Sequence, residues 1–141
     1  LEPLARGRRI LAFPFPEAAE VARLSVEEQQ EYAAALGLPG PAAEVVAQAA
    51  FEQLGLISFL TTGSDEVRAW PIRAGETARE AAGAIHSDIQ RGFIRAEVVS
   101  YSDFMSHGSN MKACRDAGVL RVEGKDYVVQ DGDIINFRFN V

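Results

Sequence analysis

The sequence predicts an α+β protein in which an α-helical segment precedes a domain with one helix on a mixed sheet. Up to residue 55, apolar residues recur at the spacing of a helix face, and prolines and glycines separate the helical segments. From residue 56 onward, short β-type runs alternate with turn residues around one strongly amphipathic segment. We therefore expect two parts of different secondary structure, residues 1–55 and residues 56–141.

The composition is that of an ordinary globular protein, because 48% of the 141 residues are hydrophobic and 24% are charged. No apolar run approaches the roughly 20 residues needed to span a bilayer, so we expect no membrane contact. The net charge of −6 argues against a general nucleic-acid-binding surface, and any RNA contact must come from a local patch. The single cysteine, Cys114, favours a reducing cytoplasm. The start lacks both Met and a signal peptide, so we expect a piece of a longer protein.

The first part begins with a short expected strand, residues 9–13, followed by three helices. Residues typical of helix ends mark their boundaries: Pro16, the capping-box pair Ser25 and Glu28, Gly37, Pro41 and Gly55. The last helix, ending at Leu54, carries an apolar stripe at helical spacing: Ala42, Val45, Val46, Ala49, Ala50 and Leu54. Such a stripe predicts a helix that packs against its neighbours.

The second part reads as strands around one helix. We expect strands and helical turns in this order: strands at 56–62, 67–72 and 96–101, helical turns over 102–118, and a last strand at 134–141. Pro71 marks a sheet edge or a bulge, because proline donates no ladder hydrogen bond. Thr77 and Glu80 form a capping box for a helix that runs to Arg91 and ends at Gly92. This order is the layout of a β-grasp (ubiquitin-like) domain.

The stretch GVLRVEGKDY, residues 118–127, nearly spells a phosphate-binding loop. Five residues rather than four separate Gly118 from Gly124, and Asp126 instead of a hydroxyl residue follows Lys125. A phosphate loop also leads from a strand into a helix, whereas a β-type run follows here. The spacing, the chemistry and the context therefore argue against a phosphate site.

The same stretch predicts a β-hairpin with Gly124 and Lys125 in a two-residue turn. In that register Val122 faces Tyr127, and the apolar residues share one face. The acidic DGD stretch, residues 131–133, invites a metal interpretation, but a turn that leads into the last strand explains it better.

Several runs resemble the C-terminal end of the YchF family of Obg-like ATPases: EVRAW, AAGAIHSD, GFIRAEV and GKDYVVQDGDIINFRFNV. The resemblance extends almost continuously over residues 56–141 and implies a TGS domain of the β-grasp fold. It implies that residues 1–55 are the end of the nucleotide-binding domain and a helical linker.

The resemblance further implies a cytoplasmic parent protein that hydrolyses ATP or GTP with Mg²⁺ and associates with ribosomes. The catalytic motifs of the family lie upstream, so we expect no catalysis, cofactor or metal in these residues. The family's Ser-Ala-basic motif near the nucleotide base falls on Pro14, Phe15 and Pro16, which lack its hydroxyl and its charge. Nucleotide contact from this segment is therefore in doubt.

Alternative functions follow from the same fold. One is a TGS interaction module of another translation or stringent-response protein that has no NTPase domain. A ubiquitin-like carrier needs a flexible Gly-Gly tail, whereas this sequence ends FRFNV within a predicted strand. A stand-alone enzyme would need a catalytic constellation, and we find none in the sequence.

The expected contact surface for RNA or ribosome combines cationic and aromatic groups near a helix end: His86, Arg91, Phe93 and Arg95. The alternative is that Phe93 and Ile94 fill the core while the arginines are solvated. A second basic face on the sheet would consist of four further arginines: Arg68, Arg73, Arg121 and Arg138.

We expect no catalytic residues. His86 and Asp88 lie two positions apart on the predicted helix and should point to different faces. His86, His107 and Cys114 show no metal-ligand spacing. These residues therefore predict structural or surface roles.

Overall fold

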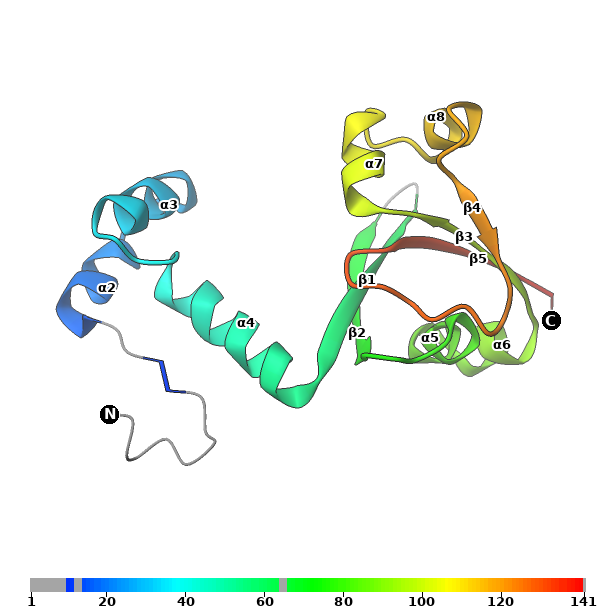
Figure 1. Ribbon diagram of the computed structural model, residues 1–141, viewed down its shortest axis with the longest axis horizontal. Helices are drawn as coiled ribbons and strands as arrows, with labels where there is room; N and C mark the ends of the chain where they lie inside the picture. Colours follow the sequence, from blue (N-terminus) through cyan, green and yellow to red (C-terminus); the bar gives the residue numbers. More distant parts are fainter. Residues whose placement is uncertain (1–9, 12–13, 64–65, 141) are drawn as a thin grey trace. The chain divides into compact units, whose positions relative to one another are not determined.

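A computed structural model of the protein describes residues 10–11, 14–63 and 66–140. The chain divides into two units, Leu1–Leu54 and Gly55–Val141. The first contains helices only among its described residues, and the second contains a five-stranded sheet with short helices (Figure 1). No described helix has the length and apolar character to cross a membrane.

The first unit contains three helices whose starts the sequence predicts: α2 (Phe15–Val21), α3 (Val26–Ala35) and α4 (Ala42–Leu54). Pro16 lies in the first turn of α2. Ser25 and Glu28 form both hydrogen bonds of the capping box, and Gly37 closes α3 with a φ of 68°. Most of the strand expected at residues 9–13 lies outside the described residues, and Ile10 and Leu11, which are described, belong to no strand.

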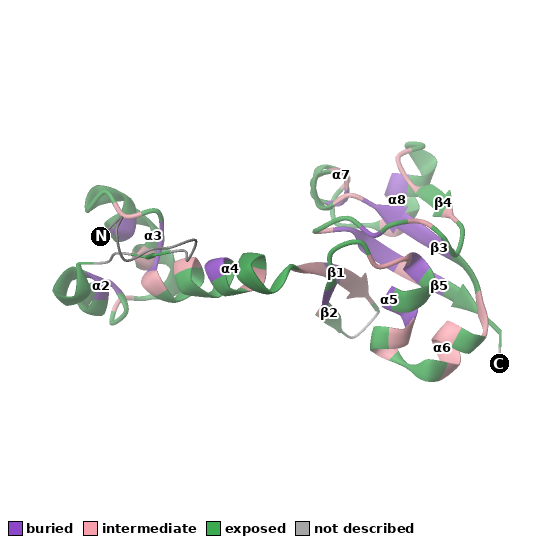
Figure 2. Cartoon of the chain, turned by 60° about the horizontal axis from the view of Figure 1, so that its bottom comes forward, coloured by how far each residue is buried: buried purple, intermediate pink, exposed green. Residues whose placement is uncertain are grey.

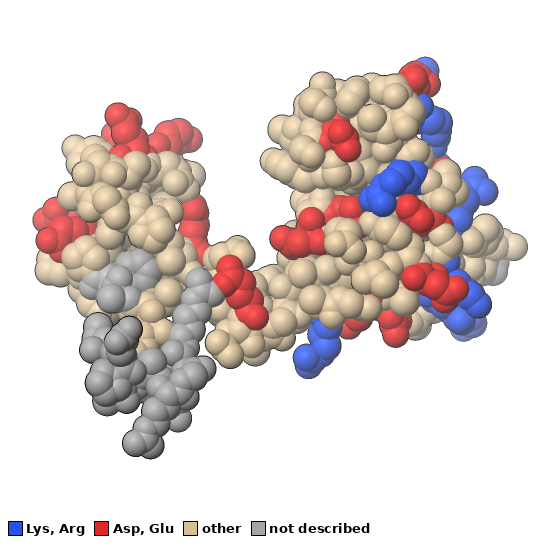
Figure 3. All heavy atoms as spheres, in the orientation of Figure 1, with Lys and Arg blue, Asp and Glu red and all other residues tan. Residues whose placement is uncertain are grey.

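Half of the apolar stripe of α4 is exposed, and one of its six residues is buried. Ala49 is the one buried residue of α4, whereas Val46 is 50% exposed and Leu54 is 61% exposed (Figure 2). The expectation that this stripe packs against its neighbours is therefore wrong for the exposed members Val46, Ala50 and Leu54. The outer surface of this unit carries Asp and Glu side chains in the view of Figure 3.

The second unit is built on a mixed sheet with strand order β2-β1-β5-β3-β4. The strands are β1 (Leu56–Thr62), β2 (Val67–Arg73), β3 (Phe93–Val99), β4 (Arg121–Glu123) and β5 (Ile134–Phe139). The two central strands β1 and β5 are parallel, and the other neighbours are antiparallel. The predicted β-grasp class is confirmed.

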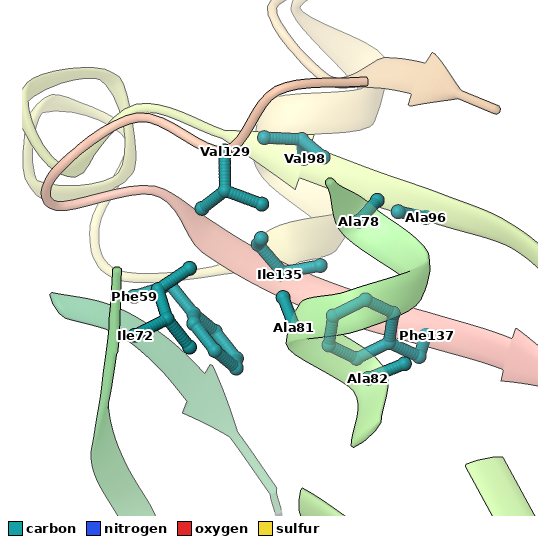
Figure 4. Close-up of a cluster of buried hydrophobic side chains, with 10 residues drawn as sticks. All are labelled: Phe59, Ile72, Ala78, Ala81, Ala82, Ala96, Val98, Val129, Ile135 and Phe137. Atoms are coloured by element: carbon teal, nitrogen blue, oxygen red, sulfur yellow. The ribbon is translucent and has the colours of Figure 1, made fainter. Parts of the chain in front are cut away.

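The main core lies between the sheet and two helices, α5 (Ala78–Ile85) and α6 (Ser87–Arg91) (Figure 4). Alanines of α5 allow close approach, and strand residues with larger side chains fill the space beneath them; the buried members are Phe59, Ile72, Ala78, Ala81, Ala82, Ala96, Val98, Val129, Ile135 and Phe137. The rings of Phe59 and Phe137 meet edge to face at 5.8 Å.

The single helix predicted over residues 78–91 is interrupted at His86. This residue has extended backbone, with φ −163° and ψ 144°, so α5 ends there and α6 begins. Its side chain caps α6, because Nδ1 accepts a hydrogen bond from the N–H of Asp88 at 3.1 Å. The apolar residues of α5 and α6 together keep the spacing of one helix face, so periodicity alone predicted a single helix.

A second, smaller core covers part of the opposite sheet face. Here α7 (Tyr101–Ser106) and α8 (Met111–Asp116) pack on the sheet, and the buried residues are Val99, Phe104, Cys114 and Ile134. Figure 1 shows α5 and α6 on one side of the sheet and α7 and α8 on the other. The burial of Cys114 in this cluster agrees with its predicted packing role.

Pro71 protects the free edge of β2, as its position predicts. The N–H of Ser58 donates to Asp131 Oδ1, and the carbonyl of Ser58 accepts from Gly132 N–H, both at 2.8 Å. Both backbone groups of Ser58 thus point away from β2, and Ser58 lies opposite Pro71 in the register. The backbone nitrogen of Pro71 therefore faces the free edge, where a missing donor hinders the addition of another strand.

The hairpin predicted from GVLRVEGKDY is wrong. The strand β4 pairs with β3 rather than with the segment that follows it. The turn is centred on Lys125 and Asp126, because Tyr127 N–H donates to the Gly124 carbonyl at 3.2 Å. Val122, which the hairpin would place on an apolar face with Tyr127, is 62% exposed.

The segment after this turn pairs with the start of α5 instead. Ala78 N–H donates to the Tyr127 carbonyl at 2.7 Å, and Val129 N–H donates to the Glu76 carbonyl at 3.1 Å. The first N–H groups of a helix lack partners within the helix, so an adjacent extended segment can accept from them. Because this segment pairs with residues that are distant in sequence, it does not form the predicted local hairpin.

Candidate functional site

His86, Asp88 and Arg91 form a small exposed charge cluster at the junction of α5 and α6. Arg91 Nη2 lies 2.8 Å from Asp88 Oδ1, and His86 Nδ1 lies 3.6 Å from Asp88 Oδ2. The side chains of His86 and Arg91 are 62% and 73% exposed. The prediction that His86 and Asp88 point to different faces is wrong, because the interruption at His86 turns its ring back onto the first turn of α6.

Phe93 and Arg95 lie on opposite faces of the sheet. Phe93 packs against the main core, and its ring centroid lies 6.1 Å from that of Phe137. A bulge at Ile94 separates it from Arg95, which is exposed on the face away from α5 and α6. Phe93 thus fills the core, as the alternative interpretation stated, whereas Ile94 is 56% exposed.

The four sequence-predicted contact residues therefore do not form one surface. His86 and Arg91 belong to the helix-covered side, Phe93 to the core, and Arg95 to the opposite face. Their role in binding a partner remains a prediction. Figure 3 shows Lys and Arg groups gathered along the outer edge of the sheet domain, beside α8 and β4.

The second predicted basic face is also divided. The guanidinium of Arg68 lies over the Trp70 ring at 4.1 Å, on the face of the main core, whereas Arg73 is one strand position beyond buried Ile72 and points the other way. Arg121 and Arg138 are both paired with acidic groups. The four arginines thus form no continuous free cationic face.

Asp133, the last residue of the DGD stretch, is a buried acidic residue. Its carboxylate accepts hydrogen bonds from the Tyr127 hydroxyl at 2.7 Å and from Gln130 N–H at 2.9 Å. Arg121 Nη2 lies 3.5 Å from it and also donates to the Tyr127 hydroxyl at 3.0 Å. Burial, followed by the hydrogen bond to Asp133, raises the pKa of Tyr127. This network anchors the turn before β5, as the DGD stretch predicts.

Glu97 is the other buried acidic residue among those the structure describes, and sequence reasoning did not single it out. It is 5% exposed, and its Oε2 accepts from Arg115 Nη2 and Arg138 Nη2, each at 3.1 Å. Asn136 Nδ2 donates to the same oxygen at 3.5 Å. A glutamate inside the β-type run AEVV is the signal that could have indicated a buried, paired carboxylate.

A shallow polar groove of about 610 Å³ lies on the helix-covered side of the domain. Its lining comes from α5, α6 and the turn after β4: Thr77, Arg79, Glu80, Ser87, Gln90, Arg91, Lys125 and Asp126. Glu80 is occupied in the capping box with Thr77, and those hydrogen bonds lower the pKa of its carboxyl. The groove is lined by both acidic and basic side chains, so it has no uniformly positive potential to attract an anion.

The stretch that resembles a phosphate loop has the wrong local structure for one. Gly118 follows α8 with a φ of 74° and leads into β4, so the chain passes from helix to strand. A phosphate loop passes from strand to helix, which aims successive N–H groups at the anion. Among the described residues, no three His, Cys, Asp or Glu side chains cluster as metal ligands.

Comparisons with known proteins match this domain to one family. Residues 56–140 match the family model YchF-GTPase_C, described as "Protein of unknown function (DUF933)". The chain is 48% identical over 122 residues to "Ribosome-binding ATPase YchF" of Bacillus subtilis (strain 168), covering 86% of this chain and 33% of that protein. It is 47% identical over 132 residues to "Obg-like ATPase 1" of Rattus norvegicus, covering 92% of this chain and 33% of that protein.

A solved structure gives the same result for the fold. "Structure of the Schizosaccharomyces pombe YchF GTPase" matches with a TM-score of 0.69 and 34% identity, covering 84% of this chain and 31% of that one. The chain therefore spans about a third of the length of the relatives it matches.

Proposed function

The chain belongs to the YchF-GTPase_C family, and we propose that it is the non-catalytic C-terminal region of a YchF-like P-loop ATPase. In this proposal, residues 1–55 are the end of the nucleotide-binding domain and the helical linker, and residues 56–141 are a TGS domain. The region serves contact with the ribosome, through RNA or protein, and regulation of the parent in the cytoplasm. The carrying observation is the 48% identity to one third of a protein named ribosome-binding ATPase.

In the proposal, the parent binds and hydrolyses ATP or GTP with Mg²⁺ through its upstream domain. Phosphoryl transfer depends on a phosphate cradle and a positioned metal ion. The helix-to-strand passage at Gly118 does not fit such a cradle, so the proposal places the cradle in the upstream domain. Of the four contact positions predicted from the sequence, the exposed His86, Arg91 and Arg95 remain proposed contacts, whereas Phe93 packs against the main core.

ATP turnover separates the two roles. We expect the purified chain of residues 1–141 to release no phosphate from ATP or GTP in the presence of Mg²⁺. A parent protein that includes the upstream domain should hydrolyse ATP under the same conditions. Turnover by the purified chain that survives repurification and scales with its concentration contradicts the non-catalytic role.

Ribosome association is tested by co-sedimentation of the parent with purified ribosomes. Removal of the segment equivalent to residues 56–141 should abolish or strongly reduce the sedimenting fraction. The ATPase rate of the truncated parent in the absence of ribosomes serves as the control for a folded nucleotide domain. Unchanged co-sedimentation of an active truncated parent excludes the contact role of the TGS domain.

A further inference from the structure

On the sheet face away from α5 and α6, two arginines hold one buried carboxylate and a third arginine lies opposite one of them in the strand register. Arg95, Arg115 and Arg138 lie on β3, α8 and β5, and Glu97 lies between the last two. The side chains of Arg115 and Arg138 are 53% and 48% exposed, so each guanidinium touches Glu97 on one side and water on the other. With one carboxylate against three guanidinium groups, the cluster keeps two uncompensated positive charges.

Arg95 and Arg138 face each other directly across the β3–β5 pair. Like charges directly opposite each other destabilise a sheet, and Arg95 has no ion-pair partner among the described residues. An anion placed between the two side chains would convert this repulsion into two attractive interactions. The register therefore points to a missing anionic partner at this position.

Glu97 prepares the site for such a partner by orienting its neighbours. Arg138 and Arg115 donate to one carboxylate oxygen, which fixes the direction of both planar forks. Each guanidinium carries five N–H donors, so most of them remain available for a further acceptor. Arginine forks held in this way suit the paired oxygens of a phosphate group.

The partner that fits this surface is the phosphate backbone of RNA. Protein–protein hot spots centre on buried aromatic anchors, and the exposed aromatic residues of this domain lie elsewhere: Tyr101 on α7, and Phe139, which pairs with Phe93. A cationic patch formed by two strands and α8, without an exposed aromatic platform, suits backbone contact rather than recognition of bases. The net charge of −6 confines this contact to a local patch.

The groove on the helix-covered side is a weaker candidate for the same partner. There Arg79, Arg91 and Lys125 are interspersed with Glu80 and Asp126. Arg91 is also neutralised by Asp88 at 2.8 Å. The two surfaces thus differ in net charge within one domain, which provides a matched control.

We infer that Arg95, Arg115 and Arg138 form a phosphate-contacting surface through which this domain binds structured RNA. The inference rests on the proposed ribosome contact and names the surface that makes it. Glu97 is a positioning residue, because it orients two of the arginines without reaching the RNA. The contact is independent of base sequence and depends strongly on salt.

The test is binding of the whole chain to a fluorescein-labelled RNA hairpin, followed by fluorescence anisotropy over a salt series. We expect Arg95→Ala/Arg138→Ala to weaken binding at least about ten-fold, since each variant removes charge-assisted hydrogen bonds. The slope of log K against log salt should fall by about two, one for each lost phosphate contact. Arg79→Ala/Lys125→Ala removes the same charge from the other side and should keep most of the affinity.

The single variant Arg95→Ala separates loss of RNA binding from loss of folding, because the buried Glu97 carboxylate is held by Arg115 and Arg138. It should lower the salt slope by about one without lowering the thermal unfolding midpoint, since it removes the repulsion from Arg138 and keeps both arginine hydrogen bonds to Glu97. Undetectable binding by the wild-type chain, or an equal loss in the Arg79→Ala/Lys125→Ala variant, overturns the inference. So does an Arg95→Ala/Arg138→Ala variant with unchanged affinity and salt slope.

Ribosomes distinguish this inference from the proposed function. If the parent sediments with ribosomes and the Arg95→Ala/Arg138→Ala parent does so equally well, the surface is wrong while the ribosome contact stands. Loss of ribosome binding together with unchanged binding to naked ribosomal RNA also overturns the inference and indicates an acidic protein partner. If the parent never sediments with ribosomes but the arginine-dependent RNA binding persists, the proposed ribosome contact fails instead.

Discussion

The helix α4 and the strand β1 adjoin Gly55 from either side, yet their apolar residues lie in opposite environments. In α4 the apolar stripe has one buried member, Ala49, and Val46 is 50% exposed. In β1, Phe59 is 0% exposed and lies in the main core. Periodicity states which face of an element is apolar, but burial requires a second surface, which β1 obtains from α5.

The core of the sheet domain should respond far more strongly to truncation than the stripe of α4. Phe59→Ala leaves a cavity beside Phe137 and should lower the free energy of unfolding by about 3–5 kcal/mol. Val46→Ala removes a half-exposed side chain and should cost less than about 0.5 kcal/mol. Urea denaturation followed by tryptophan fluorescence measures the loss for Phe59→Ala, since Trp70 packs against this core. Far-UV circular dichroism, which also reports on the helices of the first unit, measures the loss for Val46→Ala. Similar losses for the two variants would show that α4 is covered in solution.

Two glycines of the sheet domain differ in the space around them: Gly92, between α6 and β3, lies against backbone, whereas Gly124 does not. A Cβ atom at this position would lie 2.0 Å from the carbonyl oxygen of Asn140, which is backbone and cannot rotate away. Gly92→Ala should therefore cost about 3 kcal/mol of unfolding free energy through displacement of the chain after β5. Gly124→Ala is the matched control, because its Cβ would meet nothing within 4 Å. Equal stability of the two variants contradicts this close approach.

The hydroxyl of the half-buried Tyr127 allows a test of the network around Asp133. Tyr127→Phe removes the 2.7 Å hydrogen bond and should cost about 1–3 kcal/mol, since Asp133 keeps fewer donors. The folded-state pKa of Tyr127 is raised above 10.0, so this contribution is complete below pH 10 and is lost as the pH rises further. Denaturant midpoints from pH 8 to 11 check both statements. A wild-type alkaline loss that Tyr127→Phe does not reduce contradicts this assignment.

Local sequence signals predicted the elements of both units well, because their causes are local. The two capping boxes, the closing glycine Gly37 and the edge position of Pro71 all follow from the chemistry of one or two neighbouring residues. The hairpin failed because Tyr127 pairs with the start of α5, nearly fifty positions earlier. Sequence spacing carries no information on such a partner.

The candidate site was predicted less well for the same reason. Arg91 and Arg95 are close in sequence, but the interruption at His86 and the bulge at Ile94 place them on different sides of the sheet. The cluster around Glu97 joins three elements that are distant in sequence. A single buried glutamate in a β-type run was the one local sign of it.

The smallest effect concerns the capping boxes, which are chemically alike in the two units. Their hydrogen bonds lower the pKa of Glu28 and of Glu80 below 4.5. Each contribution is therefore complete above pH 4.5 and is lost as the pH falls through the lowered folded-state pKa. Ser25 caps a helix with one buried residue, whereas Thr77 caps a helix whose alanines lie in the main core.

Acid should accordingly fray α3 locally, while at α5 it should weaken the cooperative unfolding of the whole sheet domain. Amide hydrogen exchange at pH 6 and pH 3.5 resolves the two helices, with Glu28→Gln and Glu80→Gln as controls. Gln keeps a side-chain oxygen that can accept the N-cap N–H, but it does not titrate, so each variant should lose the pH dependence of its own helix. If Glu80→Gln alters exchange only within α5, the capping box there is as local as that of α3, and packing against the sheet does not couple it to the core.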